Sequence, residues 1–301
     1  MKIRFIITHS VSNRMTRIYT IITALMIFSS VPIMVMAEQA NVPVLKVCAD
    51  PYLMPFSNME EQGAENKIAE LFAKDLGAEL EYAFFPQRMG FIRNTLRADL
   101  GDGTYKCDLV ISAPVNFDLA DTTPPYYTST YVLTYAKGRG LDAVTSPDKL
   151  AELVNNGKKI KFGLFDRGPA QLWVFKQGLM DYMVPYVSQP GGLQDNPGMN
   201  MMQDILDGKI DVSIVWGPVA GYFARQNRDK AEFVMLLMED DPDNAEMRFK
   251  YGVSMAVRYG EKAWKEQVAN WIENNQGKIE DILKDYGFPL LPNQKVNDDD
   301  D

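Results

Sequence analysis

From residue 44 onward, short apolar runs alternate with amphipathic segments, and this alternation limits the possible folds more than any other feature of the chain. Strands are predicted over 44–49, 79–85 and 107–113, with helices over 68–76 and 91–97. Gly77 ends the first of these helices. Strands and helices in this order are typical of a parallel α/β sheet.

A second series of the same kind follows a predicted helix start at Ser146-Pro147, where Ser is a good cap and Pro fits the first turn. Its strands are predicted over 160–165, 184–187, 212–216 and 233–238, and its helices over 169–177, 201–206 and 219–226. Two α/β series in about 264 residues favour two lobes over a single core.

The last part of the chain is predicted to contain one long strand over 249–257 and helices over 263–271 and 279–286. One strand alone cannot form a sheet for these helices to pack on. The economical arrangement returns them to the first lobe, so the fold class is α/β, two-lobed, with crossover segments at 131–140 and 249–257. The predicted limits are 38–140 plus 249–294 for lobe 1, 141–248 for lobe 2, and an acidic disordered tail over 295–301.

The first 37 residues differ from the rest, because they hold no Asp or Glu and their four basic residues all precede an uncharged stretch over 18–37. A basic segment, an apolar segment and small residues at Val35-Met36-Ala37 predict a signal peptide over 1–37 that is cleaved on export. An uncleaved membrane anchor is the alternative, which Pro32 and Ser29-Ser30 disfavour.

Removal of this segment changes the chemistry that the chain has available. The whole chain carries −9, and the loss of four basic residues and no acidic ones leaves −13. The single histidine, His9, is lost with it, which excludes histidine nucleophile systems and histidine-ligated zinc. The acidic balance disfavours nucleic acid and anionic membranes as partners. We therefore expect no enzyme, no metal, no cofactor and no membrane contact of the mature chain.

The two cysteines, Cys48 and Cys107, would both lie in an oxidising compartment, so a disulfide between them is the first expectation. Each lies at a predicted strand. If Asp50 and Ser112 end neighbouring parallel strands side by side, the cysteines are about four residues out of register. Two free buried thiols therefore remain the alternative.

Several short motifs, in a fixed order over nearly all of the mature chain, make it resemble type II periplasmic solute-binding proteins. They are Leu45-Lys46-Val47-Cys48-Ala49-Asp50, Pro55-Phe56-Ser57, Cys107-Asp108-Leu109-Val110-Ile111-Ser112, Pro125-Tyr126-Tyr127-Thr128-Ser129, Lys161-Phe162-Gly163-Leu164-Phe165 and Asp211-Val212-Ser213-Ile214-Val215. The resemblance implies two lobes around a ligand cleft.

Three further blocks carry a narrower resemblance. They are Val47-Cys48-Ala49-Asp50-Pro51 with Pro55-Phe56-Ser57-Asn58, then Pro86-Gln87-Arg88-Met89-Gly90-Phe91-Ile92-Arg93-Asn94-Thr95-Leu96, and Trp216-Gly217-Pro218-Val219-Ala220-Gly221. Together they resemble the MxaJ/XoxJ proteins, periplasmic accessories associated with the pyrroloquinoline-quinone-dependent methanol dehydrogenases of methylotrophs; the MxaJ branch is favoured. This resemblance implies methanol dehydrogenase, or its subunits, as the partner.

Ligands of open α/β sheets bind outside the carboxyl ends of the strands, which locates the candidate cleft. The candidate residues are Asp50, Pro55, Phe56, Ser57, Asn58, Gln87, Arg88, Ala113, Pro114 and Tyr127 from the first lobe, and Phe165, Asp166, Gly168, Trp216 and Gly217 from the second. Gly168-Pro169 opens a helix, which would direct free backbone N–H groups at the cleft.

Two charged anchors of the amino-acid receptors that share this fold are missing here. Those receptors resemble one another in clamping the ligand carboxylate with an Arg that follows the strand matching 107–112. Residues 107–136 of this chain contain no Lys or Arg. They also hold the ligand amine with an acid where Trp216 and Gly217 stand. Amino acids are therefore not expected to bind.

Three of these candidate residues also fit a purely structural role. Trp216 fits packing between the lobes, Arg88 fits a surface salt bridge, and Asp50 fits the cap of a loop. For the whole protein the resemblance favours a non-catalytic accessory of methanol oxidation. The alternative is a transporter receptor for a small uncharged or aromatic solute, and whether the cleft holds a ligand is left open.

Overall fold

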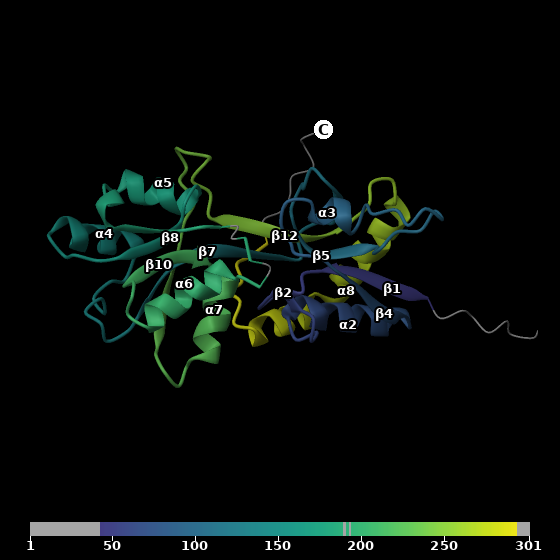
Figure 1. Cartoon of the computed structure of the whole chain (residues 1–301), viewed down its shortest axis with the longest axis horizontal. Helices are drawn as coiled ribbons and strands as arrows, with labels where there is room; N and C mark the ends of the chain where they lie inside the picture. The colour runs from purple at the N-terminus through teal and green to yellow at the C-terminus, as the bar shows by residue number, and fades with distance from the viewer. Residues whose placement is uncertain (1–42, 189–190, 193, 294–301) are drawn as a thin grey trace, which may run out of the picture. The chain divides into compact units, whose positions relative to one another are not determined.

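The computed structural model describes residues 43–188, 191–192 and 194–293. The predicted signal peptide and the predicted acidic tail lie outside these residues. Within the described ranges, no helix is both long enough and apolar enough to cross a membrane. In the described part of the chain, ten strands form one mixed sheet whose main order is β4-β1-β5-β12-β7-β10-β8-β9, and two short strands pair only with each other. Helices pack on both faces of the large sheet (Figure 1).

The first half of the sheet is built mainly from the N-terminal strands, and we refer to it with its helices as the first lobe. Its strands are β1 (Val44–Ala49), β4 (Glu79–Phe84), β5 (Leu109–Pro114), β12 (Lys250–Val257) and the short β6 (Asp121–Thr122). The short β2 (Tyr52–Leu53) and β3 (Ser57–Asn58) pair with each other outside this sheet. β1 pairs in parallel with β4 and β5, as predicted, whereas β12 pairs antiparallel with β5. The late strand β12 thus lies beside strands from the first part of the chain.

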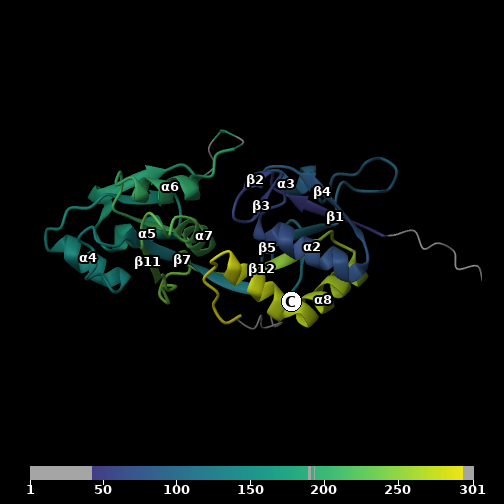
Figure 2. The same cartoon turned by 90° about the horizontal axis from the view of Figure 1, so that it is seen from below.

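Three helices cover this half: α2 (Ala64–Leu76), α3 (Phe91–Asn94) and α8 (Lys262–Asp285). α2 and α8 lie side by side in both views (Figures 1 and 2). The Phe72 and Trp271 rings stack with centroids 4.3 Å apart, and the Trp271 indole donates to Asp75 at 2.9 Å. The apolar faces of both helices therefore bury one another against the sheet.

The prediction of two C-terminal helices, 263–271 and 279–286, is wrong, because α8 runs unbroken from Lys262 to Asp285. Gly277 stands inside it with nothing within 4 Å of an added Cβ. A glycine inside a helix costs about 1 kcal/mol. Val268, Ile272, Ile279 and Leu283 on either side of it are buried, and this packing offsets that cost.

The second half of the sheet, with its helices, is the second lobe. It contains β8 (Phe162–Phe165), β9 (Met183–Tyr186), β10 (Val212–Trp216), β11 (Phe233–Leu237), α4 (Pro147–Asn155), α5 (Pro169–Lys176), α6 (Pro197–Leu206), α7 (Gly217–Gln226) and the 3₁₀ turn η1 (Met180–Tyr182). α4 begins as predicted, since the Ser146 hydroxyl accepts from Lys149 N at 3.2 Å. Apolar clusters on the two faces of this half form its core.

One long strand, β7 (Tyr127–Ala136), belongs to both halves. Its first residues pair with β12, from Tyr127–Val253 to Thr130–Lys250. Its later residues pair with β10 and β11, from Tyr131 to Ala136. The strand therefore runs from one lobe into the other, while the lobe limits drawn from the sequence stay a prediction.

Cys48 and Cys107 are joined by a disulfide, with their Cα atoms 5.4 Å apart. Cys48 pairs in register with Val110, so Cys107 precedes β5. The expected register mismatch is present but does not prevent the bond, because Cys107 lies ahead of the paired residues of β5. The next residue, Asp108, donates through its N–H to the Lys46 carbonyl of β1 at 2.7 Å. The Arg258 guanidinium donates to the carbonyl of Cys107 and to Asp108 at 2.7 Å, which fixes this stretch.

Candidate functional site

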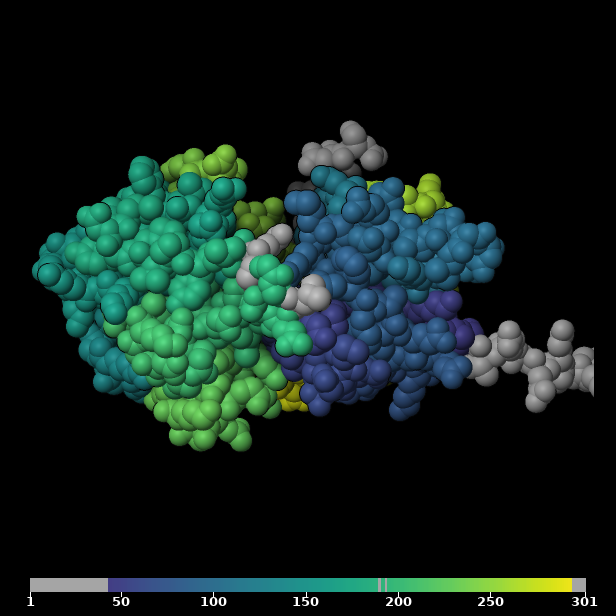
Figure 3. All heavy atoms as spheres, viewed as in Figure 1, coloured from purple at the N-terminus to yellow at the C-terminus, as the bar shows by residue number. Residues whose placement is uncertain are grey.

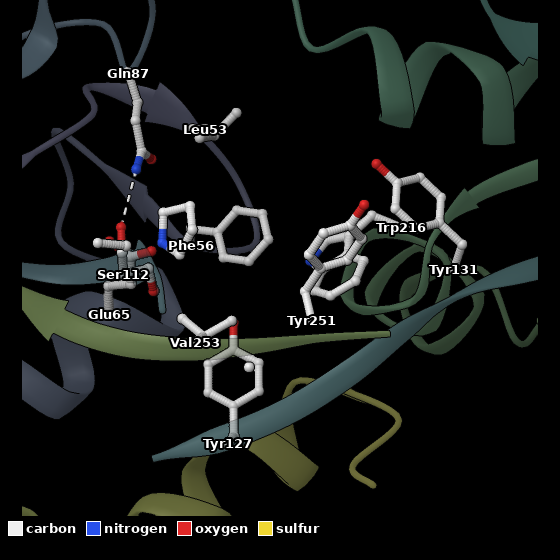
Figure 4. Close-up of a pocket in the computed structure, with 13 residues that line it drawn as sticks. Leu53, Phe56, Glu65, Gln87, Ser112, Tyr127, Tyr131, Trp216, Tyr251 and Val253 are labelled. Atoms are coloured by element: carbon white, nitrogen blue, oxygen red, sulfur yellow. Dashed lines mark hydrogen bonds between the residues drawn. The ribbon is translucent and has the colours of Figure 1, made fainter. Parts of the chain in front are cut away.

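A pocket of about 410 Å³ opens where β7 and β12 pass from the first lobe toward the second. Such a volume is within the range of small-molecule sites. It is lined by Leu53, Phe56, Glu65, Gln87, Ser112, Ala113, Pro114, Tyr127, Tyr131, Trp216, Tyr251, Gly252 and Val253. Figure 4 shows a polar end with Glu65, Ser112 and Gln87, and an aromatic end with Tyr131, Trp216 and Tyr251.

Glu65 reaches the polar end from the first turn of α2. The loop before the helix takes up the free N–H groups of that turn: Ala64 N donates to the Pro55 carbonyl at 2.8 Å and Glu65 N to the Phe56 carbonyl at 2.9 Å. Gly63 permits this approach, because an added Cβ there would lie 2.0 Å from the Phe56 oxygen. The close contact between loop and helix fixes where Glu65 stands.

Buried polar side chains support the same loop from the other side. Asn66 donates through Nδ2 to Ser57 Oγ at 3.2 Å and accepts through Oδ1 from Gly63 N at 3.0 Å. Asn58 accepts from Gln62 N at 2.7 Å. Ser57 and Asn58, both predicted for the cleft, therefore hold the start of α2 and do not line the pocket.

The Glu65 carboxyl group is buried, with 7% of the residue exposed. Its Oε1 has no hydrogen-bond partner among the described residues. Burial raises the pKa of Glu65 to about 7; a hydrogen bond with Ser112 opposes this shift and the negative charge of Asp50 adds to it. The pocket thus contains an acid that changes charge near neutral pH, which is typical of functional sites.

Asp50 lies behind the polar end of the pocket. Its carboxylate accepts from Tyr52 N at 2.7 Å and from Gln87 N at 2.5 Å. This is the loop-capping reading given above. The second bond also places Gln87, whose Nε2 donates to the Ser112 carbonyl at 3.1 Å (Figure 4). Asp50 acts on the pocket by fixing Gln87 and by its charge.

The aromatic end is a set of three rings that contact one another edge to face. The Trp216 ring centroid lies 5.4 Å from that of Tyr131 and 6.1 Å from that of Tyr251. The three come from β10, β7 and β12, which lie at the junction of the lobes. Trp216 is therefore both packed at this junction, as its structural reading held, and part of the pocket wall.

Six of the candidate cleft residues line the pocket: Phe56, Gln87, Ala113, Pro114, Tyr127 and Trp216. Nine lie elsewhere: Asp50, Pro55, Ser57, Asn58, Arg88, Phe165, Asp166, Gly168 and Gly217. Phe165 packs in the core of the second lobe. Gly217 begins α7, where an added Cβ would lie 2.5 Å from the Thr130 carbonyl oxygen.

Gly168 begins α5, and its carbonyl accepts from Gln171 N and Leu172 N, at 3.1 and 3.2 Å. Asp166 N donates to the Tyr186 carbonyl at 3.2 Å. These contacts are internal to the second lobe. In this structure the start of α5 does not border the pocket.

The lobes touch at the rim of the pocket through two polar contacts. Arg88 donates to the Gly192 carbonyl, and Asn196 Nδ2 donates to the Met54 carbonyl at 2.7 Å. In the space-filling view the green residues of the second lobe meet the purple residues of the first (Figure 3). Arg88, predicted as a cleft residue or a surface salt bridge, bonds here to a backbone carbonyl.

Sequence reasoning missed Glu65, Tyr131 and Tyr251. A signal for Glu65 was present, because it lies three, four and seven positions before Ile68, Ala69 and Phe72, on the buried stripe of α2. A charged residue on an apolar stripe indicates a buried acid. Tyr131 and Tyr251 had no such signal, since only the crossing of β7 and β12 brings them together.

Two curated relatives, both named Protein MoxJ, match most of the chain. The one from Paracoccus denitrificans is 24% identical and covers 84% of this chain and 91% of the relative. The one from Methylorubrum extorquens is 26% identical and covers 85% of this chain and 84% of the relative. No known family model matches the chain.

Solved structures agree with these relatives. The periplasmic binding protein XoxJ of Methylobacterium extorquens AM1 is 29% identical, with a TM-score of 0.64 over 82% of this chain and 99% of that one. The structure of MxaJ from Methlophaga aminisulfidivorans MPT is 22% identical, with a TM-score of 0.64, and covers 82% of this chain and 100% of that one. At this identity it supports the fold alone.

These neighbours confirm the α/β fold of type II periplasmic binding proteins that the sequence predicted. The chain is about as similar in sequence to the two MoxJ proteins as to the XoxJ structure. The preference for the MxaJ branch therefore stays a prediction. The sequence relatives and the XoxJ structure together support the resemblance to the MxaJ/XoxJ proteins that the sequence indicated.

Proposed function

We propose that this protein is a non-catalytic periplasmic accessory of a pyrroloquinoline-quinone-dependent methanol dehydrogenase, and that it acts by binding the enzyme or one of its subunits. The observation that carries the proposal is the similarity to two MoxJ proteins over 84% and 85% of the chain. Assembly, maturation and the holding of a subunit are all actions of a binding protein of this kind.

The chemistry of the mature chain supports a binding role. Residues 38–301 hold no histidine, and the acid that faces the pocket, Glu65, has no second carboxyl group beside it in the pocket wall of the described structure. General acid–base catalysis by a carboxyl pair needs two such groups around one substrate. The pocket instead offers one acid and several rings, which suits recognition.

The pocket lining also disfavours an amino-acid receptor, which leaves a transporter receptor for a small uncharged or aromatic solute as the alternative function. Among its described lining residues there is no Lys or Arg to pair with a ligand carboxylate. The relatives between 24% and 29% identical carry the names MoxJ and XoxJ, which further weakens the transporter reading.

The rim of the pocket is the surface that we propose for the enzyme contact. Met89 is 92% exposed and follows Gln87 and Arg88, which lie at the pocket and at the contact between the lobes. An apolar side chain so exposed next to a cleft is a good anchor for a protein partner. Phe175 on α5, 71% exposed, offers a matched apolar residue on the second lobe.

The test is capture of the dehydrogenase from the periplasm of methanol-grown cells with the affinity-tagged protein. We expect the wild-type protein and the Phe175→Asp variant to retain the enzyme, and the Met89→Asp variant to lose at least about tenfold in retained enzyme. Capture should weaken at high salt, because charge steering reaches only about 10 Å at 0.1 M salt.

The outcomes separate the possibilities. Capture that survives Met89→Asp and fails with Phe175→Asp would move the contact to the second lobe. Deletion of the gene should lower active methanol dehydrogenase and leave solute uptake unchanged. Normal dehydrogenase activity together with lost uptake of one solute would instead establish a transporter receptor.

A further inference from the structure

The polar end of the pocket contains a hydrogen-bonding group that the protein itself does not satisfy. Glu65 Oε1 is buried and has no partner among the described residues. Leaving a buried acceptor unpaired is costly, and the cost is larger for a charged group. Since the same side chain lines the pocket, a ligand can supply the missing donor after the carboxyl group turns about its last torsion, which is soft in Glu.

The remaining walls indicate the charge of that ligand. Glu65 is the one side chain with a formal charge among the described residues of the lining, and the lining holds no Lys, Arg or His. The other end presents the rings of Tyr131, Trp216 and Tyr251 (Figure 4). Aromatic faces carry partial negative charge and attract cations, with Trp the strongest of them. Both ends of the pocket therefore favour a positive ligand.

The pocket equally excludes several other ligand classes. A carboxylate or phosphate would meet Glu65 and the ring faces without an opposing cation in the lining. A zwitterionic amino acid carries such a carboxylate. A fully apolar ligand would leave Glu65 Oε1 unpaired. A cation with N–H groups and an apolar body can donate to Glu65 and pack against the aromatic rings at the same time.

We propose that this pocket is a binding site for a small organic ammonium ion, whose N–H groups donate to the Glu65 carboxylate while its apolar part packs against Tyr131, Trp216 and Tyr251. The assignment stands on the pocket itself and does not depend on the dehydrogenase partner. Failure to capture the enzyme and failure to bind the ion are therefore separate results.

The surroundings of Glu65 make this binding depend on pH. The groups that act on its carboxyl are Asp50, Ser112, Tyr126 and Tyr127. Burial keeps the pKa of both tyrosines above the ordinary value, so they stay neutral. Tyr82, also near Glu65, is raised in the same way. Ionisation of Glu65 near pH 7 should therefore increase the affinity of the site for a cation as pH rises.

The test is calorimetric titration of the purified protein at pH 8 with compounds that share one body and differ in charge. Benzylammonium and phenylethylammonium supply the cation on two spacer lengths, benzyl alcohol is the neutral probe and benzoate is the anion. We expect at least one ammonium ion to bind about tenfold more tightly than benzyl alcohol, and no binding of benzoate. The ammonium affinity should fall about tenfold between pH 8 and pH 6.

The matched variants are Glu65→Gln and Glu70→Gln. Both lie on α2, but Glu70 is exposed and pairs with Lys67 at 2.5 Å. We expect Glu65→Gln to lose at least about tenfold in ammonium affinity and to keep the affinity for benzyl alcohol, whereas Glu70→Gln keeps both. Equal binding of the alcohol and the ammonium ions, or no ammonium binding up to about 10 mM, overturns the proposal on the wild-type protein alone, so it does not depend on whether a variant folds.

Discussion

The two ends of the pocket reach their stability in different ways. The polar end stands on the first lobe, where Asp50 holds the loop that carries Gln87 and the disulfide Cys48–Cys107 ties β1 to the start of β5, the strand that carries Ser112. At the aromatic end the side chains of Tyr131, Trp216 and Tyr251 contact one another through their rings, on three strands of the sheet. One end keeps an unpaired buried oxygen, whereas the rings of the other already satisfy one another.

The difference indicates which end of the pocket gains more free energy when a ligand binds. Rings that already contact each other edge to face leave no buried hydrogen-bonding group unpaired when the pocket is empty. A buried acid without a partner is costly until a donor arrives. Rigid support by covalent and buried hydrogen bonds is what allows the first lobe to keep such a group.

The largest effect is expected from the disulfide that supports the polar end. The double variant Cys48→Ala/Cys107→Ala should lose about 4 kcal/mol in free energy of unfolding, because the disulfide closes a loop with a sequence separation of 59. Urea unfolding of the variant and of the wild type measures this. A loss under about 1 kcal/mol would mean that packing alone holds the polar end.

The next effect comes from Glu65 and depends on pH. Because the pKa of Glu65 is about 7 in the folded protein and 4.5 as the ordinary value, its contribution to stability is fully present below pH 4.5 and is lost as pH rises through 7. The Glu65→Gln variant should therefore gain about 3 kcal/mol relative to the wild type between pH 4.5 and pH 8.

Unfolding curves over this pH range measure the gain, with Glu70→Gln as the exposed control on the same helix. A difference between Glu65→Gln and wild type that does not change with pH would contradict a buried acid at the polar end. It would also remove the basis for the contrast between the two ends.

The smallest of the three effects is expected at the aromatic end. Trp216→Ala removes two ring contacts from a half-buried side chain and should cost about 2 kcal/mol, whereas Trp216→Phe should cost under about 1 kcal/mol. Both effects should be independent of pH between 4.5 and 8. Denaturant unfolding at the two pH values tests this, and a pH-dependent loss would link the two ends more closely than the contacts indicate.

Much of the fold follows from sequence because its elements are locally encoded. The alternation at 79–85 and the apolar run at 44–49 predicted β4 and β1 to within one residue at each end. The long helix α8 was misread, since Gly277 weakens the local pattern and burial on both sides restores it. Long-range packing decides such cases.

The site was less accessible to sequence reasoning. Phe56, Gln87 and Trp216 were found because they follow predicted strands or loops at the expected edge of the sheet. Ser57 and Asn58 follow the same rule, yet their side chains turn toward α2 and hold it. Tyr251 required knowledge of which strand pairs with β12, which periodicity along the chain does not encode.

The strand β7 has a mechanical consequence. β7 pairs with β12 up to Thr130–Lys250, and Tyr131 N still donates to the Phe249 carbonyl at 3.2 Å, so the joint between the lobes is a ribbon of two paired strands. Such a ribbon resists stretching but twists and coils with its hydrogen bonds intact. We therefore expect relative motion of the lobes to involve a torsion of this ribbon, restrained by the stacking of Tyr222 on Tyr286 between α7 and the end of α8. A molecule seated against Tyr131 and Tyr251 would contact both strands of this ribbon, so its binding would resist that torsion.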